Sequence, residues 1–159
     1  GTTWFGNINA GAKARIDNIE IDVKWPQQGD FDGNPNNSSI AATFTSPDFT
    51  LFAAGDIEPP VQAQLLSRIG KVDIYKVAHH GSRFQDFDLL RELSPTIAVV
   101  SVGSENSYGH PAPSTIEALT QLDAKVLRTD VDGAVAIRAE RHRLSIQRSK
   151  RWARLFFWN

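Results

Sequence analysis

The spacing of apolar residues along the chain changes near residue 59. Before that point apolar and polar positions alternate, which predicts a half-buried strand at 15–25 and a hairpin formed by "SSIAATF" and "FTLFAA". After it, stretches with helical spacing follow short apolar stretches in turn. The predicted helices are 61–69, 84–93 and 115–122, the predicted strands are 72–78, 96–102 and 124–129, and "AVAIRA" and "RLSIQR" predict a closing hairpin.

Strands that alternate with helices indicate an α/β fold, with a mixed sheet, parallel β-α crossovers and flanking hairpins. In such a sheet the loops that follow parallel strands lie along one edge, where ligands usually bind. Residues able to bind a metal or move a proton follow four successive predicted strands. They are Asp56, the pair His79 and His80, the pair Asn106 and His110, and Asp130. This clustering is the main functional signal of the sequence.

The composition excludes some classes of site and leaves others open. The length of 159 residues suits one domain with a core. Cysteine is absent, which excludes disulfides and thiolate metal sites, and no apolar run approaches the roughly 20 residues of a membrane span. Methionine is also absent. We therefore expect the chain to be a piece of a longer protein.

The net charge of −1 hides a basic C-terminal end, because residues 138–159 contain seven Lys or Arg and one acid, Glu140. Arginine-rich tails bind nucleic acid through counterion release, and the candidates for such contacts are Arg148, Lys150 and Arg151. The alternative is that these charges solvate an outer hairpin or lie beside lipid headgroups.

Two of the four histidines stand side by side in "KVAHHGS", where an apolar strand ends. In an extended chain neighbouring side chains point to opposite faces, so we expect one imidazole to bind a ligand and the other to pack or to support it. His80 is the preferred metal ligand and His79 the less favoured one. Gly81 permits a tight turn with positive φ.

Ser82 invites interpretation as a nucleophile, but a structural role fits it better. "SRFQ" matches a capping box with Ser82 at the N-cap and Gln85 at N3 of the helix at 84–93. Phe84 and Phe87 then belong to the buried side of that helix. In the later loops, His110 is expected to touch substrate or a metal-bound water, or else to pack, and Asn106 to hold its loop through bonds to backbone groups.

Carboxylate and imidazole together are ligands of zinc or manganese. A carboxylate that bridges two such ions can position a hydroxide nucleophile, and phosphodiester hydrolysis suits that arrangement. Asp56 is a candidate metal ligand, although a turn or cap role is also open, as it is for Asp130. A zinc site usually takes at least three protein ligands, and Asp56 with one histidine supplies two.

Five short motifs occur in a characteristic order and spacing: "NNSS" (36–39), "AAGDIE" (53–58), "KVAHHGS" (76–82), "SVGSENSYGHP" (101–111) and "RTDVDG" (128–133). Together they resemble the second half of the metallo-β-lactamase-like domain at the C-terminus of ComEC-type DNA-internalisation competence proteins. The resemblance covers residues 18–137 and leaves the basic, aromatic tail 138–159 outside it. It implies a single domain over 1–159 that is the C-terminal part of an αββα fold.

The resemblance also implies a two-metal hydrolase, with zinc or manganese, that degrades one DNA strand during uptake and transformation. By position, Asp56 takes the place of the metal-bridging aspartate and His80, or else His79, that of the last ligand histidine. His110 joins Asp56 and His80 as a catalytic candidate. Asn37 falls where many metallo-β-lactamases have another ligand histidine. Residues expected to support the ligands or touch substrate are Asn37, Ser82, Asn106 and Asp130.

The family's "HxHxDH" motif is not in this chain. We therefore expect an incomplete nuclease domain that alone binds metal weakly or not at all, with no small-molecule cofactor. The expected partners are single-stranded DNA, the missing N-terminal half of the domain and a membrane channel. The parent is expected in the bacterial plasma membrane, with this domain soluble on the outer face. The alternatives are a non-catalytic DNA-binding or scaffold module, and a hydrolase of another phosphodiester or a lactone.

Overall fold

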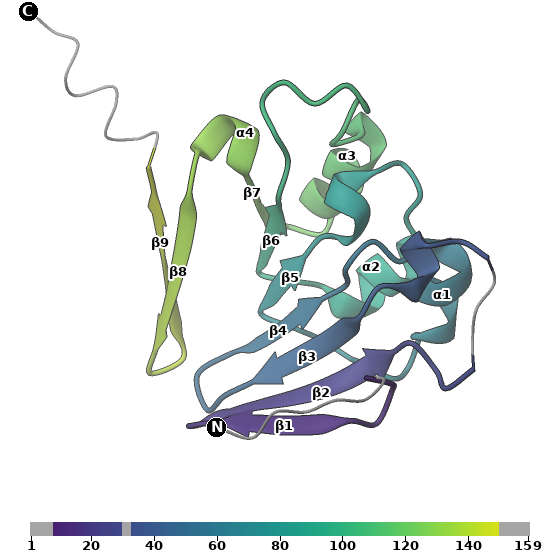
Figure 1. Cartoon of the computed structure of the whole chain (residues 1–159). Coiled ribbons are helices and arrows are strands. Elements are labelled where there is room, and N and C mark those ends of the chain that lie inside the picture. Colours follow the sequence, from purple (N-terminus) through teal and green to yellow (C-terminus); the bar gives the residue numbers. More distant parts are fainter. Residues whose placement is uncertain (1–7, 30–32, 150–159) are drawn as a thin grey trace, which may run out of the picture.

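The computed structural model describes residues 8–29 and 33–149, and it places seven strands in one mixed sheet in chain order (Figure 1). The strands are β1 (Lys13–Ile16), β2 (Ile19–Trp25), β3 (Ala41–Thr45), β4 (Thr50–Ala53), β5 (Ile74–Lys76), β6 (Ile97–Val100) and β7 (Lys125–Arg128). Pairing is antiparallel from β1 to β4 and parallel from β4 to β7. A separate antiparallel hairpin follows, formed by β8 (Val135–Glu140) and β9 (Arg143–Arg148). The predicted α/β class and mixed sheet are confirmed.

Short helices connect the parallel strands and lie on one face of the sheet (Figure 1). They are α1 (Pro59–Gln64), α2 (Phe87–Leu93) and α3 (Pro113–Gln121). The short helix α4 (Thr129–Asp132) lies between β7 and the hairpin, and the 3-10 turns η1 (Asn36–Ser38) and η2 (Ala78–Gly81) follow β2 and β5. None of the helices among the described residues combines the length and the hydropathy needed to cross a lipid bilayer.

The main core lies between the sheet and helices α1 to α3. Phe52, Tyr75 and Ala98 are directly opposite one another on β4, β5 and β6, and all three are fully buried. The rings of Phe52 and Tyr75 stack with their centroids 5.9 Å apart. Leu89 and Leu119 belong to the same buried cluster. Burial of these apolar side chains stabilises the parallel half of the sheet and therefore fixes the positions of its strand ends.

The other face of the sheet carries the β8–β9 hairpin. Leu51, Ile74 and Val99 on this face line a cavity together with Val135 and Ile137 of the hairpin. Both strands of the hairpin alternate half-buried and exposed residues, which is the pattern of a two-stranded layer packed on one side. The sheet therefore has apolar side chains on both faces.

The prediction of one strand at 15–25 is wrong, because the chain reverses direction within it. Asp17 has φ of 52°, a left-handed conformation that short polar residues adopt more readily than most. The turn at Asp17 and Asn18 separates β1 from β2, and Ile16 pairs with Ile19 across it. Apolar residues lie at positions 14 and 16 and then at 19, 21, 23 and 25, so the alternation shifts by one position at Asp17 and Asn18, two residue types common in turns. This shift is the signal that the prediction of a single strand missed.

The predicted capping box at Ser82 is also wrong, because α2 begins later than expected. Asp86 is its N-cap, with the carboxylate accepting from the backbone N–H groups of Asp88 and Leu89. As a result Phe84 lies before the helix and is 47% exposed, and Phe87 is 42% exposed, against the prediction that both are buried. Ser82 and Asp86 both have side chains typical of an N-cap, and tertiary contacts selected the second.

Candidate active site

Asp56 lies in the turn after β4, and the "NNSS" segment sets its position. Gly55 has φ of +58°, and a Cβ there would lie 2.7 Å from Ser39 Cβ and 3.1 Å from the Ile40 carbonyl oxygen. Only glycine fits this close approach without displacing the neighbouring chain. The backbone N–H of Asp56 donates to Ser39 Oγ over 3.1 Å. The carboxylate itself remains 38% exposed and free to meet a ligand.

Asn37 supports this loop from the opposite side. It is 5% exposed, and its Oδ1 accepts a hydrogen bond of 2.9 Å from the Glu58 N–H. The Glu58 carboxylate in turn accepts from the side-chain amides of Asn34 and Asn36, over 2.8 Å and 3.0 Å. A network of asparagines thus holds the loop that carries Asp56. Asn37 therefore contacts this loop through the backbone N–H of Glu58.

His79 and His80 do not continue strand β5 in extended form, so the premise that they point to opposite faces of a strand is wrong. Both adopt left-handed backbone conformations, with φ and ψ of 46° and 49° for His79 and of 54° and 24° for His80. Such conformations are strained for residues other than glycine, and they persist where surrounding contacts impose them. The His79 N–H donates to the Gly55 carbonyl over 3.0 Å, which ties the two loops together.

The expected positive φ at Gly81 is confirmed, at 76°. A Cβ at this position would lie 2.8 Å from Pro111 Cβ and 3.1 Å from Val100 Cγ1. The histidine turn is therefore packed directly against the loop that follows β6. This contact brings His110 next to His79, with ring centroids 5.5 Å apart in an edge-to-face arrangement.

The two histidine side chains have different partners. His80 Nδ1 lies 2.7 Å from the Ser101 carbonyl oxygen, and because a carbonyl only accepts, Nδ1 must carry the proton. Nε2 of His80 then has a free lone pair, and it lies 3.7 Å from Asp56 Oδ1. His79 Nδ1 lies 3.4 Å from Glu58 Oε1 and makes no hydrogen bond. His80 therefore has the arrangement of a metal ligand, and His79 that of a neighbour that supports it.

The distance between Asp56 and His80 suits a shared ion. Two ligand atoms bound to a tetrahedral ion at about 2.1 Å each would lie about 3.4 Å apart, so a small side-chain rotation suffices. A complete site needs more than these two groups. Across residues 8–29 and 33–149, no group of three or more His, Cys, Asp or Glu side chains could hold a metal ion. The described residues therefore do not fit a complete metal site, and Asp56 and His80 are the two candidate ligands that lie close together.

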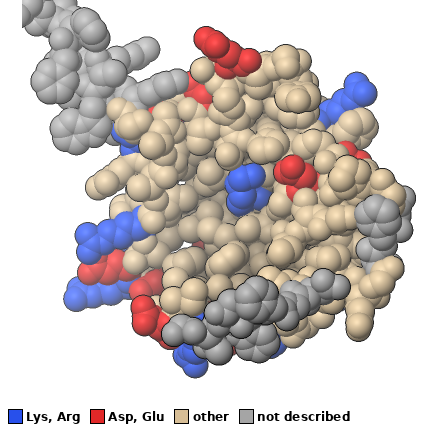
Figure 2. Space-filling view, in the orientation of Figure 1, with Lys and Arg blue, Asp and Glu red and all other residues tan. Residues whose placement is uncertain are grey.

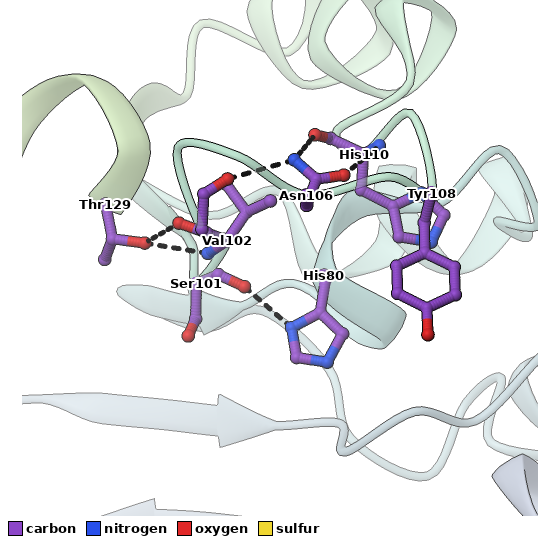
Figure 3. A pocket seen from close by; sticks show the side chains of 8 residues that line it. His80, Ser101, Val102, Asn106, Tyr108, His110 and Thr129 are labelled. Atoms are coloured by element: carbon purple, nitrogen blue, oxygen red, sulfur yellow. Dashed lines mark hydrogen bonds between the residues drawn. The ribbon is translucent and has the colours of Figure 1, made fainter.

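The loop after β6 closes the site on its other side, and Asn106 holds it as expected. Its Nδ2 donates to the carbonyls of Gly103 and His110, over 3.0 Å and 2.9 Å, and its Oδ1 accepts from the His110 N–H (Figure 3). Burial lowers the pKa of His110, the adjacent His79 and His80 lower it further, and Asp56 opposes them. His110 is therefore mainly neutral at pH 7.

These loops enclose an open cavity of about 450 Å³ beside His80 (Figure 3). Besides His80, the side chains on its wall include Asn106, Tyr108, His110 and Thr129. No Asp or Glu is among the residues that line it. The cavity thus offers hydrogen-bonding and aromatic groups to a ligand whose charged part would reach Asp56 and His80.

Two of the predicted supporting residues have structural partners instead. Ser82 is fully buried and its Oγ accepts from the Phe84 N–H over 3.2 Å. Asp130 is paired with Arg128, whose Nη2 lies 2.6 Å from its Oδ2, and this hydrogen bond holds the pKa of Asp130 below its ordinary value. Asp130 does not line the cavity, whereas Thr129 before it does. The Thr129 hydroxyl bonds both backbone groups of Val102, each over 2.7 Å.

The basic C-terminal end is only partly described, since Lys150 and Arg151 lie outside the described residues. Arg148 Nη1 lies 2.9 Å from Asp132, and Arg138 Nη2 lies 2.7 Å from Glu140. Figure 2 shows the corresponding mixture of blue and red side chains along the edge that the hairpin forms. Within the described part of the hairpin, these arginines are thus partly neutralised by acids.

Sequence reasoning missed three further residues at the site. Glu58 lies against His79, and the acid two positions after Asp56 in "GDIE" was a signal for it. Lys76 at the end of β5 is half-buried; burial lowers its pKa, and the nearby charge of Asp56 opposes this shift. Tyr108 is 82% exposed and lines the cavity. Its position two residues before His110 in "YGHP" was the only signal in the sequence for a role at the site.

Comparison with known proteins finds similarity to several proteins named for competence or recombination. It is 28% identical over 134 residues to "ComE operon protein 3" of Bacillus subtilis, covering 82% of this chain and 17% of that protein. It is 30% identical over 102 residues to "Recombination protein 2" of Haemophilus influenzae, covering 64% and 13%. "Competence protein ComA" of Neisseria gonorrhoeae is 27% identical over 127 residues, covering 77% and 18%. These similarities fit the ComEC-type competence proteins that the sequence motifs resemble.

The chain thus spans less than a fifth of the length of these relatives. No family model matches it. A solved structure named as a "putative metal-dependent hydrolase" from Parabacteroides distasonis has a TM-score of 0.50, with 18% identity, covering 77% of this chain and 56% of that one. This likeness supports the metallo-β-lactamase-like fold expected from the sequence motifs.

Proposed function

We propose that this chain contributes part of a metal-dependent hydrolase site that cleaves DNA phosphodiesters during DNA uptake. The observation that carries the proposal is the pair of Asp56 Oδ1 and His80 Nε2, 3.7 Å apart at the end of the parallel strands. The carbonyl of Ser101 orients the imidazole, as is usual for histidine ligands of metals. Homology to competence proteins supports DNA as the substrate.

In this proposal the chain's own residues have separate roles. Asp56 and His80 would hold one side of a zinc or manganese ion, which when bound lowers the pKa of water and so supplies hydroxide at neutral pH. Glu58 and His79 keep the histidine turn in place. His110, fixed by Asn106 and mainly neutral, can accept a hydrogen bond or a proton from the substrate side of the cavity.

The remaining ligands would come from the rest of the parent protein, for which we propose an N-terminal half of the domain that carries them. The proposal includes a parent in the bacterial plasma membrane, with this domain on the outer face and a channel that admits the surviving strand. The short length of the chain relative to its homologues is consistent with this arrangement.

A second candidate is a non-catalytic DNA-binding or scaffold module. The observation that favours it is that no group of three or more His, Cys, Asp or Glu among the described residues could hold a metal, whereas a zinc site usually needs at least three protein ligands. In that case the parent would bind single-stranded DNA in a salt-dependent way without turnover.

The deciding experiment uses the complete parent protein and a labelled single-stranded oligonucleotide, with Mn²⁺ or Zn²⁺ and then with EDTA. We expect cleavage with metal and none with EDTA. Asp56→Asn should lower the cleavage rate on the order of 100-fold or more, since even changes to outer-shell partners of a metal cost 10–100-fold. Asp88→Asn, which changes the same charge at an exposed position of α2, is the control.

Cleavage that continues in EDTA, or that is equally fast in Asp56→Asn, would contradict the hydrolase proposal. Binding without cleavage under any metal condition would instead favour the scaffold module.

A further inference from the structure

Tyr108 stands out among the large apolar and aromatic side chains of the described residues because it is 82% exposed. The next most exposed, Ile16, reaches 61%. A single exposed aromatic residue is common on protein surfaces and by itself means little. Here, however, the exposed ring lies at the wall of the cavity beside His80, where a bound ligand would contact it.

The loop presents Tyr108 in a defined orientation. Two residues before it, Asn106 makes three hydrogen bonds within the loop, and two of them fasten the backbone of His110. The inner side of the Tyr108 ring stacks on the His110 ring, with centroids 6.0 Å apart and planes 18° from parallel. A tyrosine has few rotatable bonds, so little conformational entropy is lost when its exposed ring meets a ligand.

A series of aromatic rings connects Tyr108 with the candidate metal ligands. His110, stacked under Tyr108, contacts His79 edge to face at 5.5 Å, and the His79 and His80 ring centroids lie 6.3 Å apart. In Figure 3 the rings of Tyr108 and His80 project from their loops toward the same side. A flat ligand on Tyr108 would therefore be held next to the group that faces Asp56.

From this geometry we propose that Tyr108 is a stacking platform for a nucleobase of single-stranded DNA, beside the phosphodiester held at Asp56 and His80. The proposal deepens the proposed function and rests on it. Bases stack on exposed aromatic rings with little dependence on sequence, because every base has a π-face. Among the described residues no Asp or Glu lines the cavity itself, and the carboxylate of Asp56 lies beyond His80, 3.7 Å from its Nε2.

The test measures affinity separately from cleavage. The complete parent protein in EDTA is titrated into a fluorescent oligothymidylate, and into an abasic oligonucleotide of the same length, with binding read by anisotropy. Tyr108→Ala should weaken binding to oligothymidylate by about tenfold, the order expected for loss of one stacked base, and leave abasic binding unchanged. Tyr108→Phe should bind both as the wild type does. Phe87→Ala removes a partly exposed ring at a different cavity and is the matched control.

Equal affinity of Tyr108→Ala and wild type for oligothymidylate would overturn the proposal, as would an equal loss on the abasic strand or the absence of any binding of DNA. Melting temperatures of all variants exclude unfolding as the cause of a loss. Cleavage of the abasic strand with Mn²⁺ tests the hydrolase independently, because that substrate has phosphodiesters and no base. If Tyr108→Ala binds oligothymidylate normally while the abasic strand is cleaved, only the stacking proposal fails. If Tyr108→Ala loses affinity while no strand is cleaved, only the hydrolase proposal fails.

Discussion

Single residues of this chain gain their roles from the backbone around them. Gly55 and Gly70 both have positive φ, +58° and +76°. A Cβ on Gly55 would meet Ser39, whereas a Cβ on Gly70 meets no atom within 4 Å. Comparing the same substitution at the two glycines therefore separates the energetic cost of a left-handed backbone conformation from the cost of a steric clash.

We expect Gly55→Ala to lower the free energy of unfolding by about 1 kcal/mol or more beyond the effect of Gly70→Ala. Both variants adopt an unfavourable φ, which costs about 1–2 kcal/mol, and only Gly55→Ala also displaces the segment at Ser39. Urea denaturation of both variants measures the difference. Equal destabilisation would show that the approach of the two loops is not close in solution.

The histidine pair offers a second prediction at the residue scale. His80→Ala removes a proposed ligand, whereas His79→Ala removes a ring whose nitrogen faces Glu58. In the complete parent, His79→Ala should lower zinc affinity by about 10–100-fold, the loss typical of a residue that supports a metal ligand. His80→Ala should lower zinc affinity by more than this. Competition with a chromogenic chelator measures both. A larger loss in His79→Ala would exchange the two roles.

At the scale of elements, the position of helix α2 depends on its N-cap. Asp86→Ala should destabilise the protein by about 1 kcal/mol, because the helix loses acceptors for two of its first N–H groups. Asp88→Ala, in the same turn, removes only an exposed pair with Arg91 and should cost less than about 0.5 kcal/mol. Denaturant titration of both variants is the measurement, and equal effects would place the cap elsewhere.

The β8–β9 hairpin is the element that covers part of the second sheet face. Ile137 lines the cavity between them, and Arg138 beside it points to solvent with its side chain 76% exposed. Ile137→Ser should therefore cost about 1–2 kcal/mol, as a partly buried apolar side chain is removed. Arg138→Ser should change stability by less than about 0.5 kcal/mol. If both are neutral, the hairpin does not pack on the sheet in solution.

For the whole molecule, the prediction concerns metal and stability together. An ion that binds only the folded state raises the melting temperature by mass action. We expect Zn²⁺ or Mn²⁺ to raise that of the complete parent, and EDTA to reverse the rise. The 159-residue chain alone should show little shift, since no group of three or more His, Cys, Asp or Glu among its described residues could hold an ion. Nanomolar affinity of this chain by calorimetry would contradict the prediction.

Much of the architecture was predictable because it depends on local patterns. Alternation identified β3, β4, β8 and β9, and the sequence of strand and helix periods identified the parallel half of the sheet. The boundaries that failed were those where two local solutions compete. Asp17 and Asn18 shift the alternation by one position, and one irregular strand competes there with two strands joined by a turn. Ser82 and Asp86 both have side chains typical of an N-cap, but Ser82 directly follows the 3-10 turn Ala78–Gly81 and α2 begins after Asp86.

The sequence alone determined which chemical groups reach one edge of the sheet, because periodicity identifies the strands and their ends, and parallel strands joined by β-α crossovers end at the same edge. It also determined where the chain must turn sharply, since Gly55 and Gly81 allow φ values that other residues rarely adopt. Only the tertiary structure decided which atoms face one another. A carbonyl of Ser101 turns His80 toward Asp56, and Glu58 lies against His79 instead. Such choices arise from packing between distant segments, on which local periodicity carries no information.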